Sequence, residues 1–344
     1  MLIGLCSDLH FHLGKKSDYI DIIFKSLDFF FSECSKKEIT KVVICGDVVE
    51  YKDRIEISVQ DKLLDYFREK KADGFEIYFV VGNHETLNRV DNEINFLKIF
   101  SDSFFVAKDY EVIEFEKGIT CHFLPYFKDD ILMDEKIPLL ATVPGKNYLF
   151  THLSFKNFDV GGGHEDIWSE LESSVIEEIG FDHVFSGHYH KHSTKGKTTY
   201  ISSPMVTNFG EAGEEKYHGF VFADLSKNKF TFIQNPHTIK YKKVELTKET
   251  LKDMLSTENY FYQVFLKKVY EQSYLEKIKQ KIEEKNFKVQ FKYDLNKGNS
   301  SLSKIDGWTD MISQKPIDLL KSFVSIQKNK TEEEKKYLIE FIER

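Results

Sequence analysis

Short apolar runs alternate with amphipathic segments over the first part of the chain. Residues 2–7, 42–45 and 77–81 are strongly apolar, as expected for buried strands. Between them, residues 18–35 and about 57–71 repeat apolar positions at helical spacing. Strands and helices therefore alternate, which is typical of a parallel sheet with helices on its outside.

The pattern becomes rich in strands after a further helix near 91–101. Strands are predicted at 111–115, 120–124, 147–151, 184–185, 199–202 and 218–225, with a glycine-rich loop at 156–166 and a helix at 169–179. The early alternation and the later strands together predict an α/β fold in which helices flank two mixed β-sheets. We assign residues 1–236 to this domain.

The composition shifts near Pro236, where a second domain is expected. Residues 237–294 are predicted to be a small α+β domain, with strands at 240–245, 260–266 and 287–293 and helices at 247–255 and 271–285. Residues 295–344 are predicted to form a polar linker and two short amphipathic helices. This helical pair either folds back onto the core or docks on a partner.

Composition excludes several classes of protein. The chain has 344 residues, of which 41% are hydrophobic, and this is enough for a large buried core. No apolar run is long enough to span a membrane, and Asp8 and His10 interrupt the region where a signal peptide needs its apolar core. We expect a cytoplasmic protein with no membrane partner. The four cysteines lack paired spacing and are expected to be buried and reduced.

Charge is unevenly distributed along the chain. The net charge of −8 argues against a protein that coats nucleic acid by bulk positive charge. Residues 265–292 nevertheless contain eight lysines and only four glutamates. This segment is either a surface that contacts a nucleic-acid backbone or the solvated face of a helix. For backbone contact the candidates are Lys267, Lys268, Lys277 and Lys281.

Five of the predicted strands end in side chains that can bind metal ions. They are Asp8 and His10, Asp47, Asn83 and His84, His152, and His188 and His190. Each alone has an ordinary explanation as a helix cap, a turn former or a core histidine, but their recurrence at five strand ends favours one shared site. Oxygen and imidazole donors without thiolate suit manganese, iron, zinc or magnesium in a two-ion centre, which Asp47 would bridge.

The order of these motifs resembles the calcineurin-type metallophosphoesterase signature over about residues 1–225. In this sequence the signature is Asp8-x-His10, Gly46-Asp47, Gly82-Asn83-His84-Glu85, His152 and Gly187-His188-x-His190. The resemblance implies that one divalent ion is held by Asp8, His10, Asp47 and His190, and the other by Asp47, Asn83, His152 and His188. It also implies that His84 is an unligated acid that protonates the leaving oxygen.

The residues after the last motif are similar to those of the SbcD/Mre-eleven family of DNA-repair nucleases. They are Tyr200-Ile201-Ser202-Ser203-Pro204, Phe209-Gly210-Glu211 and Gly219-Phe220. This resemblance implies a DNA exonuclease and endonuclease of recombination, repair or replication in a bacterial or phage-infected cell, with two manganese ions or else magnesium. It further implies a homodimer through the helices near 57–70 and 91–101, a DNA-binding capping domain at 237–294, and C-terminal helices that bind an SMC-like coiled-coil ATPase of the SbcC type.

The sequence departs from this family at Glu50, three residues after Asp47. Many members have a histidine there, which helps to orient the phosphate. We expect Glu50 to occupy that phosphate-orienting position, with an altered balance between exonuclease and endonuclease activity.

Two other functions are compatible with the same motifs. One is a phosphodiesterase for nucleotides or other small substrates, because the signature specifies the reaction and leaves the substrate open. The other is a subunit that mainly holds DNA ends for its ATPase partner. Every ligand position of the signature carries a residue that can bind a metal ion, which argues against a catalytically inactive site.

Overall fold

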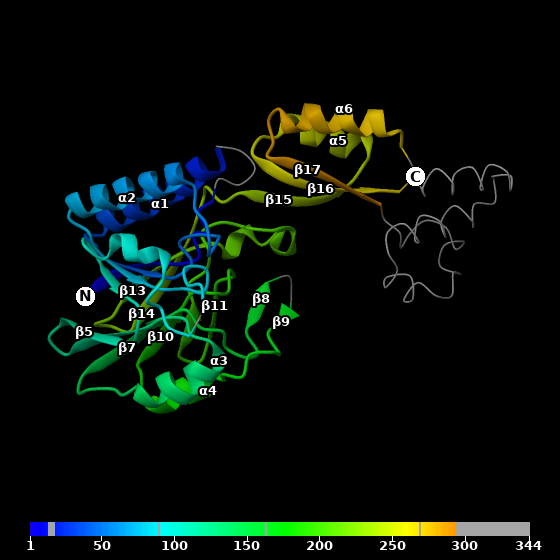
Figure 1. Cartoon of the computed structure of the whole chain (residues 1–344). Coiled ribbons are helices and arrows are strands. Elements are labelled where there is room, and N and C mark those ends of the chain that lie inside the picture. The colour runs from blue at the N-terminus through cyan, green and yellow to red at the C-terminus, as the bar shows by residue number, and fades with distance from the viewer. Residues whose placement is uncertain (13–17, 89, 162–163, 268–269, 294–344) are drawn as a thin grey trace, which may run out of the picture. The chain divides into compact units, whose positions relative to one another are not determined.

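The computed structural model describes residues 1–12, 18–88, 90–161, 164–267 and 270–293 (Figure 1). Met1–Lys292 form one compact unit, and Tyr293–Arg344 form a second, of which only Tyr293 is described. The expected linker, the two C-terminal helices and Lys268 therefore lie outside the described residues.

Six strands form the first sheet, in the order β14-β13-β1-β2-β3-β4. They are β1 (Leu2–Cys6), β2 (Lys41–Cys45), β3 (Glu76–Val80), β4 (Phe105–Ala107), β13 (Gly219–Asp224) and β14 (Lys229–Gln234). β1 to β4 run parallel, and β13 lies antiparallel beside β1. The helices α1 (Asp18–Lys36) and α2 (Ile57–Ala72) connect the parallel strands and lie side by side (Figure 1). Their apolar faces, which include Ile23, Leu63 and Phe67, are buried against this sheet.

Six further strands form the second sheet, in the order β11-β12-β10-β7-β6-β5. They are β5 (Glu111–Glu116), β6 (Ile119–Leu124), β7 (Lys146–Thr151), β10 (His183–Ser186), β11 (Ser193–Lys195) and β12 (Thr198–Tyr200). One face packs on α4 (Ser173–Ile179), α3 (Asp129–Ile131), the π-helix Leu132–Lys136 and the 3₁₀ helix Ile137–Leu139. The other face meets the first sheet around a core that includes Leu5, Val43 and Phe150. The expected α/β fold of two mixed sheets flanked by helices is confirmed.

A third sheet contains β15 (Lys240–Glu245), β16 (Tyr260–Leu266) and β17 (Lys288–Tyr293), and we call residues 240–293 the cap. Its helices are α5 (Lys248–Ser256) and α6 (Gln272–Glu283), so the order of elements is the one expected for 237–294. Val264 packs with Ile278 in the cluster between sheet and helices. Alternate residues of a strand point to opposite faces, and Tyr241 and Phe261 accordingly join the core around α1, where Phe261 contacts Tyr19.

The structure corrects the expected elements in several places. Residues 91–101 contain only the 3₁₀ helix Phe96–Phe100, because Asn95 immediately before it is extended and pairs with Thr86 in a β-bridge. This part of the expected dimer interface is therefore not an α-helix. Residues 156–166, expected as an open loop, contain the hairpin strands β8 (Asp159–Gly161) and β9 (His164–Glu165). The apolar pattern does not predict β4 and β11, because three residues are too few to show alternation.

Two further features of the described chain concern its cysteines and the length and polarity of its helices. All four cysteines are buried and free of disulfides, and burial raises the pKa of each thiol: Cys6, Cys34, Cys45 and Cys121. Reduced core residues of this kind are what the sequence predicts. None of the helices in the described part of the chain combines the length and the apolar character needed to cross a lipid bilayer.

Candidate metal centre

The ends of five parallel strands bring the predicted metal-binding side chains together. β1 leads to Asp8 and His10, β2 to Asp47, β3 to Asn83 and His84, β7 to His152, and β10 to His188 and His190. Three groups have ligand atoms within 4.8 Å of one another: Asp8, His10 and His190; His10, Asp47 and His84; and Asp47, His152 and His188. Asn83 lies against the third group. Every one of these residues therefore belongs to one site.

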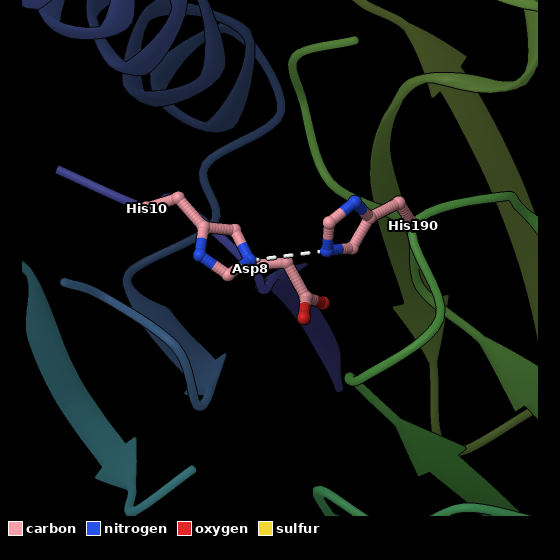
Figure 2. Close-up of side chains that lie close together, drawn as sticks. All are labelled: Asp8, His10 and His190. Carbon is pink, nitrogen blue, oxygen red and sulfur yellow. Dashed lines mark hydrogen bonds between the residues drawn. The ribbon is translucent and has the colours of Figure 1, made fainter. Parts of the chain in front are cut away.

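Asp8, His10 and His190 form one side of the site, and Figure 2 shows how the two rings face each other. The Nε2 atoms of His10 and His190 are 3.0 Å apart, so a proton or a cation must lie between their lone pairs. Asp8 is fully buried, and its carboxylate accepts the backbone N–H of His188 at 3.0 Å. This side has the donors that a hard or borderline divalent cation needs.

Asp47, Asn83, His152 and His188 form the other side. The amide oxygen of Asn83 lies 3.0 Å from Nε2 of His152 and 2.9 Å from Nδ1 of His188. Oδ2 of Asp47 lies 3.2 Å from Nε2 of His152 and 3.9 Å from Nε2 of His10. Asp47 therefore faces both groups, as a carboxylate that bridges two cations must.

Unusual backbone conformations aim several of these side chains. Four of them have positive φ angles, namely Asp8 (53°), His10 (50°), Asp47 (53°) and His188 (90°). Such conformations are strained for residues with a side chain, and strain of this kind collects at functional sites. Close packing explains why two positions of the motifs are occupied by glycine. A Cβ atom on Gly187 would collide with the Cys45 carbonyl and with His152, and one on Gly82 would collide with Asp47.

A buried glutamate that the sequence analysis does not single out holds two of the ligand loops. The Glu85 carboxylate accepts the backbone N–H groups of Asp47 at 2.9 Å, Val49 at 3.1 Å and Gly82 at 2.8 Å. Burial and the neighbouring Asp47 charge raise the pKa of Glu85 to about 7. Its position at the end of the Gly-Asn-His-Glu motif is the only sequence signal for this role.

Burial and neighbouring charges shift the pKa values of the histidines in opposite directions. Burial alone would lower the pKa of His152, but the charge and hydrogen bond of Asp47 outweigh it and raise this pKa to about 10. Burial also opposes charge on His190, but contact with Glu211 raises its pKa to about 9. The pKa of His188 falls to about 3, because the ring is buried beside His152. A divalent cation must displace any proton on the nitrogen that it binds, so cation binding is expected to depend on pH.

His84 and Glu50 face the space in front of these ligands. Nδ1 of His84 lies 2.5 Å from the backbone oxygen of Glu50, and this carbonyl can only accept, so Nδ1 carries a proton. Nε2 of His84 is the ring nitrogen that lies near Asp47, at 4.0 Å. The Glu50 carboxylate lies 2.8 Å from Nδ1 of His10, and this contact outweighs burial and lowers the pKa of Glu50.

A cavity of about 390 Å³ opens over the site. Five of the predicted ligands line it, namely His10, Asp47, Asn83, His188 and His190, and Tyr51, Tyr19, Tyr241 and Phe261 contribute to its walls. Tyr241 and Phe261 come from the cap and stack on each other with ring centroids 4.5 Å apart. No motif in the sequence marks these aromatic residues, because they become neighbours only through the packing of the cap.

Of the lysines expected to contact DNA, the three that the structure describes do not line this cavity. Among the described ones, Lys267 pairs with Glu245 at 2.5 Å, close to the end of β16. Lys277 and Lys281 are exposed on α6. This helix packs on the face of the cap sheet that is opposite to the cavity, so these two lysines cannot contact a phosphate bound at the ligands.

Two mixed sheets with a candidate two-cation site at the ends of their parallel strands indicate a metal-dependent phosphoesterase. The comparison with family models agrees, because the model of the calcineurin-like phosphoesterases matches residues 1–192 of the 344. The chain belongs to the calcineurin-like phosphoesterase family.

Two solved structures are similar to this chain at low sequence identity. A dimetal phosphatase from Danio rerio is 12% identical, with a TM-score of 0.39, and the match covers 65% of this chain and 92% of that one. GAP50, the anchor in the inner membrane complex of Plasmodium, is 10% identical, with a TM-score of 0.39 and coverage of 70% and 91%. A search of curated proteins finds no match. The family assignment therefore rests on residues 1–192.

Proposed function

We propose that this chain is a two-metal phosphodiesterase that hydrolyses DNA. The observation that carries the metal-dependent chemistry is the convergence of ligand atoms around Asp47, with imidazoles on both sides of this carboxylate. Bound divalent cations, manganese or magnesium by the family resemblance, would neutralise phosphate charge and activate water. The residues that would hold them are Asp8, His10, Asp47, Asn83, His152, His188 and His190.

His84 is the proton donor in this proposal. Its Nδ1–H is bound to the Glu50 backbone oxygen, so the protonated ring offers only Nε2–H to the cavity. In the reaction, the oxygen of water forms a bond to phosphorus and releases one of its two protons to solvent, and the bond from phosphorus to the sugar oxygen breaks. The Nε2 proton of His84 moves to the departing sugar oxygen, which leaves as a hydroxyl.

Two features support DNA as the substrate. The residues from Tyr200 to Phe220 resemble those of the SbcD/Mre-eleven nucleases. The cap contributes Tyr241 and Phe261 to the cavity that also holds the ligands, so a substrate at the ligands lies against the cap. Contacts of Lys277 and Lys281 would then involve more distant parts of the DNA backbone, and such contacts read no sequence.

The proposal is tested by cleavage of linear duplex DNA in the presence of Mn²⁺. The wild type is expected to cleave, and His84→Gln is expected to lose about 10²- to 10⁴-fold in rate with its Mn²⁺ binding unchanged. His164→Gln is the matched control, because His164 is exposed on β9. A His84→Gln variant as active as the wild type contradicts the assignment. Cleavage of cyclic nucleotides or bis-p-nitrophenyl phosphate, but not of DNA, would favour the small-substrate alternative.

We also propose a homodimer and a coiled-coil ATPase partner of the SbcC type, on the family resemblance alone. Deletion of residues 308–344 is expected to abolish ATPase binding in a pull-down and to leave Mn²⁺ binding intact. If the shortened chain still binds the ATPase, this segment is not the docking element. If the ATPase binds while DNA cleavage is absent, a role in holding DNA ends is favoured.

A further inference from the structure

Both imidazoles beside Asp8 have a second carboxylate near their outer nitrogen. Oε1 of Glu211 lies 2.9 Å from Nδ1 of His190, and Oε2 of Glu50 lies 2.8 Å from Nδ1 of His10. The inner nitrogens of the same two rings face each other at 3.0 Å. Each ring therefore lies between a carboxylate and the position where a cation would bind.

Glu211 is held firmly in this place. Its side chain is 7% exposed and accepts the backbone N–H of Thr207 at 2.8 Å and the side-chain amide of Asn208 at 2.6 Å. The same turn is anchored to the cap, because the Tyr241 hydroxyl donates to the Thr207 carbonyl at 2.8 Å. A carboxylate can only accept, so Nδ1 of His190 carries a proton and Nε2 presents its lone pair to the site.

Glu50 makes a weaker contact of the same kind. Its side chain is 33% exposed, so water competes for the carboxylate. The approach to Nδ1 of His10 is close, but its direction is not that of a hydrogen bond. We therefore expect Glu50 to orient His10 less strongly than Glu211 orients His190.

Apart from the shared Asp47 carboxylate, the partners on the other side of the site are neutral. Nδ1 of His152 lies 2.8 Å from the Cys45 carbonyl, and the oxygen facing both His152 and His188 belongs to the Asn83 amide. A carboxylate behind an imidazole makes the ring a more basic ligand than a carbonyl does. The side with Asp8 therefore offers more negative charge and more basic nitrogens to a cation.

We propose that Glu211 is a positioning residue that holds His190 for a divalent cation, with Glu50 acting more weakly on His10. Together they make the position formed by Asp8, His10 and His190 the tighter of two unequal cation positions. This inference rests on the proposed two-metal site, and it does not depend on DNA as the substrate. It also assigns Glu50 a place beside a metal ligand, in addition to its place on the cavity wall.

The test is a titration of the metal-free chain with Mn²⁺, in which electron paramagnetic resonance measures the free ion. The wild type is expected to bind in two steps. Glu211→Gln is expected to weaken the tighter step about 10- to 100-fold and to spare the weaker one, and Glu50→Gln to weaken the tighter step less. Glu214→Gln is the matched control, because Glu214 pairs with Lys191 at 3.3 Å and is expected to leave both steps unchanged.

A second measurement separates positioning from folding. Thermal unfolding in the presence of a chelator shows whether Glu211→Gln is native. If it is not, Asn208→Ala, which removes a donor to the carboxylate, is expected to weaken the same step to a smaller extent. Unchanged affinity of the tighter step in a natively folded Glu211→Gln variant overturns the inference and leaves the proposed function standing. A wild type that binds no Mn²⁺ overturns both.

Discussion

The amide oxygen of Asn83 lies 2.9 Å from Nδ1 of His188, although 105 residues separate the two in the sequence. The same oxygen is 3.0 Å from Nε2 of His152. A carbonyl-type oxygen has two lone pairs, so both nitrogens can approach it, and it can equally act as a neutral ligand to a cation beside them. This contact joins the first sheet to the second at the candidate metal centre.

Replacement of Asn83 is expected to weaken one cation position. In Asn83→Ala the oxygen ligand is lost while Asp8, His10 and His190 are untouched, so the weaker of the two Mn²⁺ steps should lose at least about 10-fold in affinity. Isothermal titration calorimetry measures this change. Asn88→Ala is the control, because Asn88 is exposed and bonds to Asp91. Loss of both steps to the same extent would contradict separate roles for the two groups.

Removal of the Glu85 carboxylate is expected to destabilise the protein and disturb the site together. Glu85→Ala leaves three buried backbone N–H groups without their acceptor, and each unsatisfied group costs about 1–3 kcal/mol. Urea unfolding in the presence of a chelator should therefore show a free energy of unfolding that is lower by several kcal/mol. Glu116→Ala, at an exposed position on β5, should change it little. Equal stability of the two variants would show that water replaces the carboxylate.

A methyl group at Gly187 is expected to affect metal binding, whereas one at Gly74 is not. A Cβ on Gly187 collides with the Cys45 carbonyl and the His152 ring, and such overpacking costs about 1–3 kcal/mol. Gly74 has open space around its Cβ position but a φ of 98°. Gly74→Ala is therefore expected to lower stability only through backbone strain, by about 1–2 kcal/mol. Stability should fall in both variants, and Mn²⁺ affinity should fall only in Gly187→Ala. Unchanged affinity there would contradict the packing around His152.

His183 is expected to make stability depend on pH in the acid range. This ring is buried on β10 and bonds to the Thr199 hydroxyl at 2.8 Å. Burial, with a smaller effect of the Lys197 charge, lowers its pKa to about 4. The unfolded chain takes up a proton near pH 6.5, and the folded chain does so only near pH 4, so stability is lost as the pH falls between these values.

The loss attributed to His183 amounts to about 3 kcal/mol over this range. Urea unfolding of the metal-free wild type and of His183→Gln at pH 7, 6, 5 and 4 measures it. The wild type should lose about that much more free energy of unfolding than His183→Gln, because the other histidines titrate in both proteins. Parallel pH profiles would show that His183 is not buried as a neutral ring.

Much of the architecture follows from local patterns. β1, β2 and β3 are short apolar runs that end in polar residues, and α1 and α2 have apolar faces at helical spacing, so these elements can be recognised without tertiary information. Parallel strands place their carboxyl ends at one edge of a sheet. This is why Asp8, Asp47 and Asn83 could be assigned to one site from the sequence.

Other elements depend on contacts between distant residues. The helix expected near 91–101 is reduced to Phe96–Phe100, because the bridge between Thr86 and Asn95 competes with helical hydrogen bonds. β4 is only three residues long and exists because β3 lies beside it. No periodicity over so few residues can distinguish such a strand from a loop.

The sequence by itself predicted which side chains form the candidate metal centre and the strand ends from which they come, because strand periodicity and the types of donor atom are local properties. Only the tertiary structure decided which nitrogen of each ring faces the site, through the Cys45 carbonyl behind His152 and the Glu211 carboxylate behind His190. It also decided that Tyr241 of the cap lines the cavity. These properties arise from contacts across two sheets and the cap, and no spacing within one segment contains them.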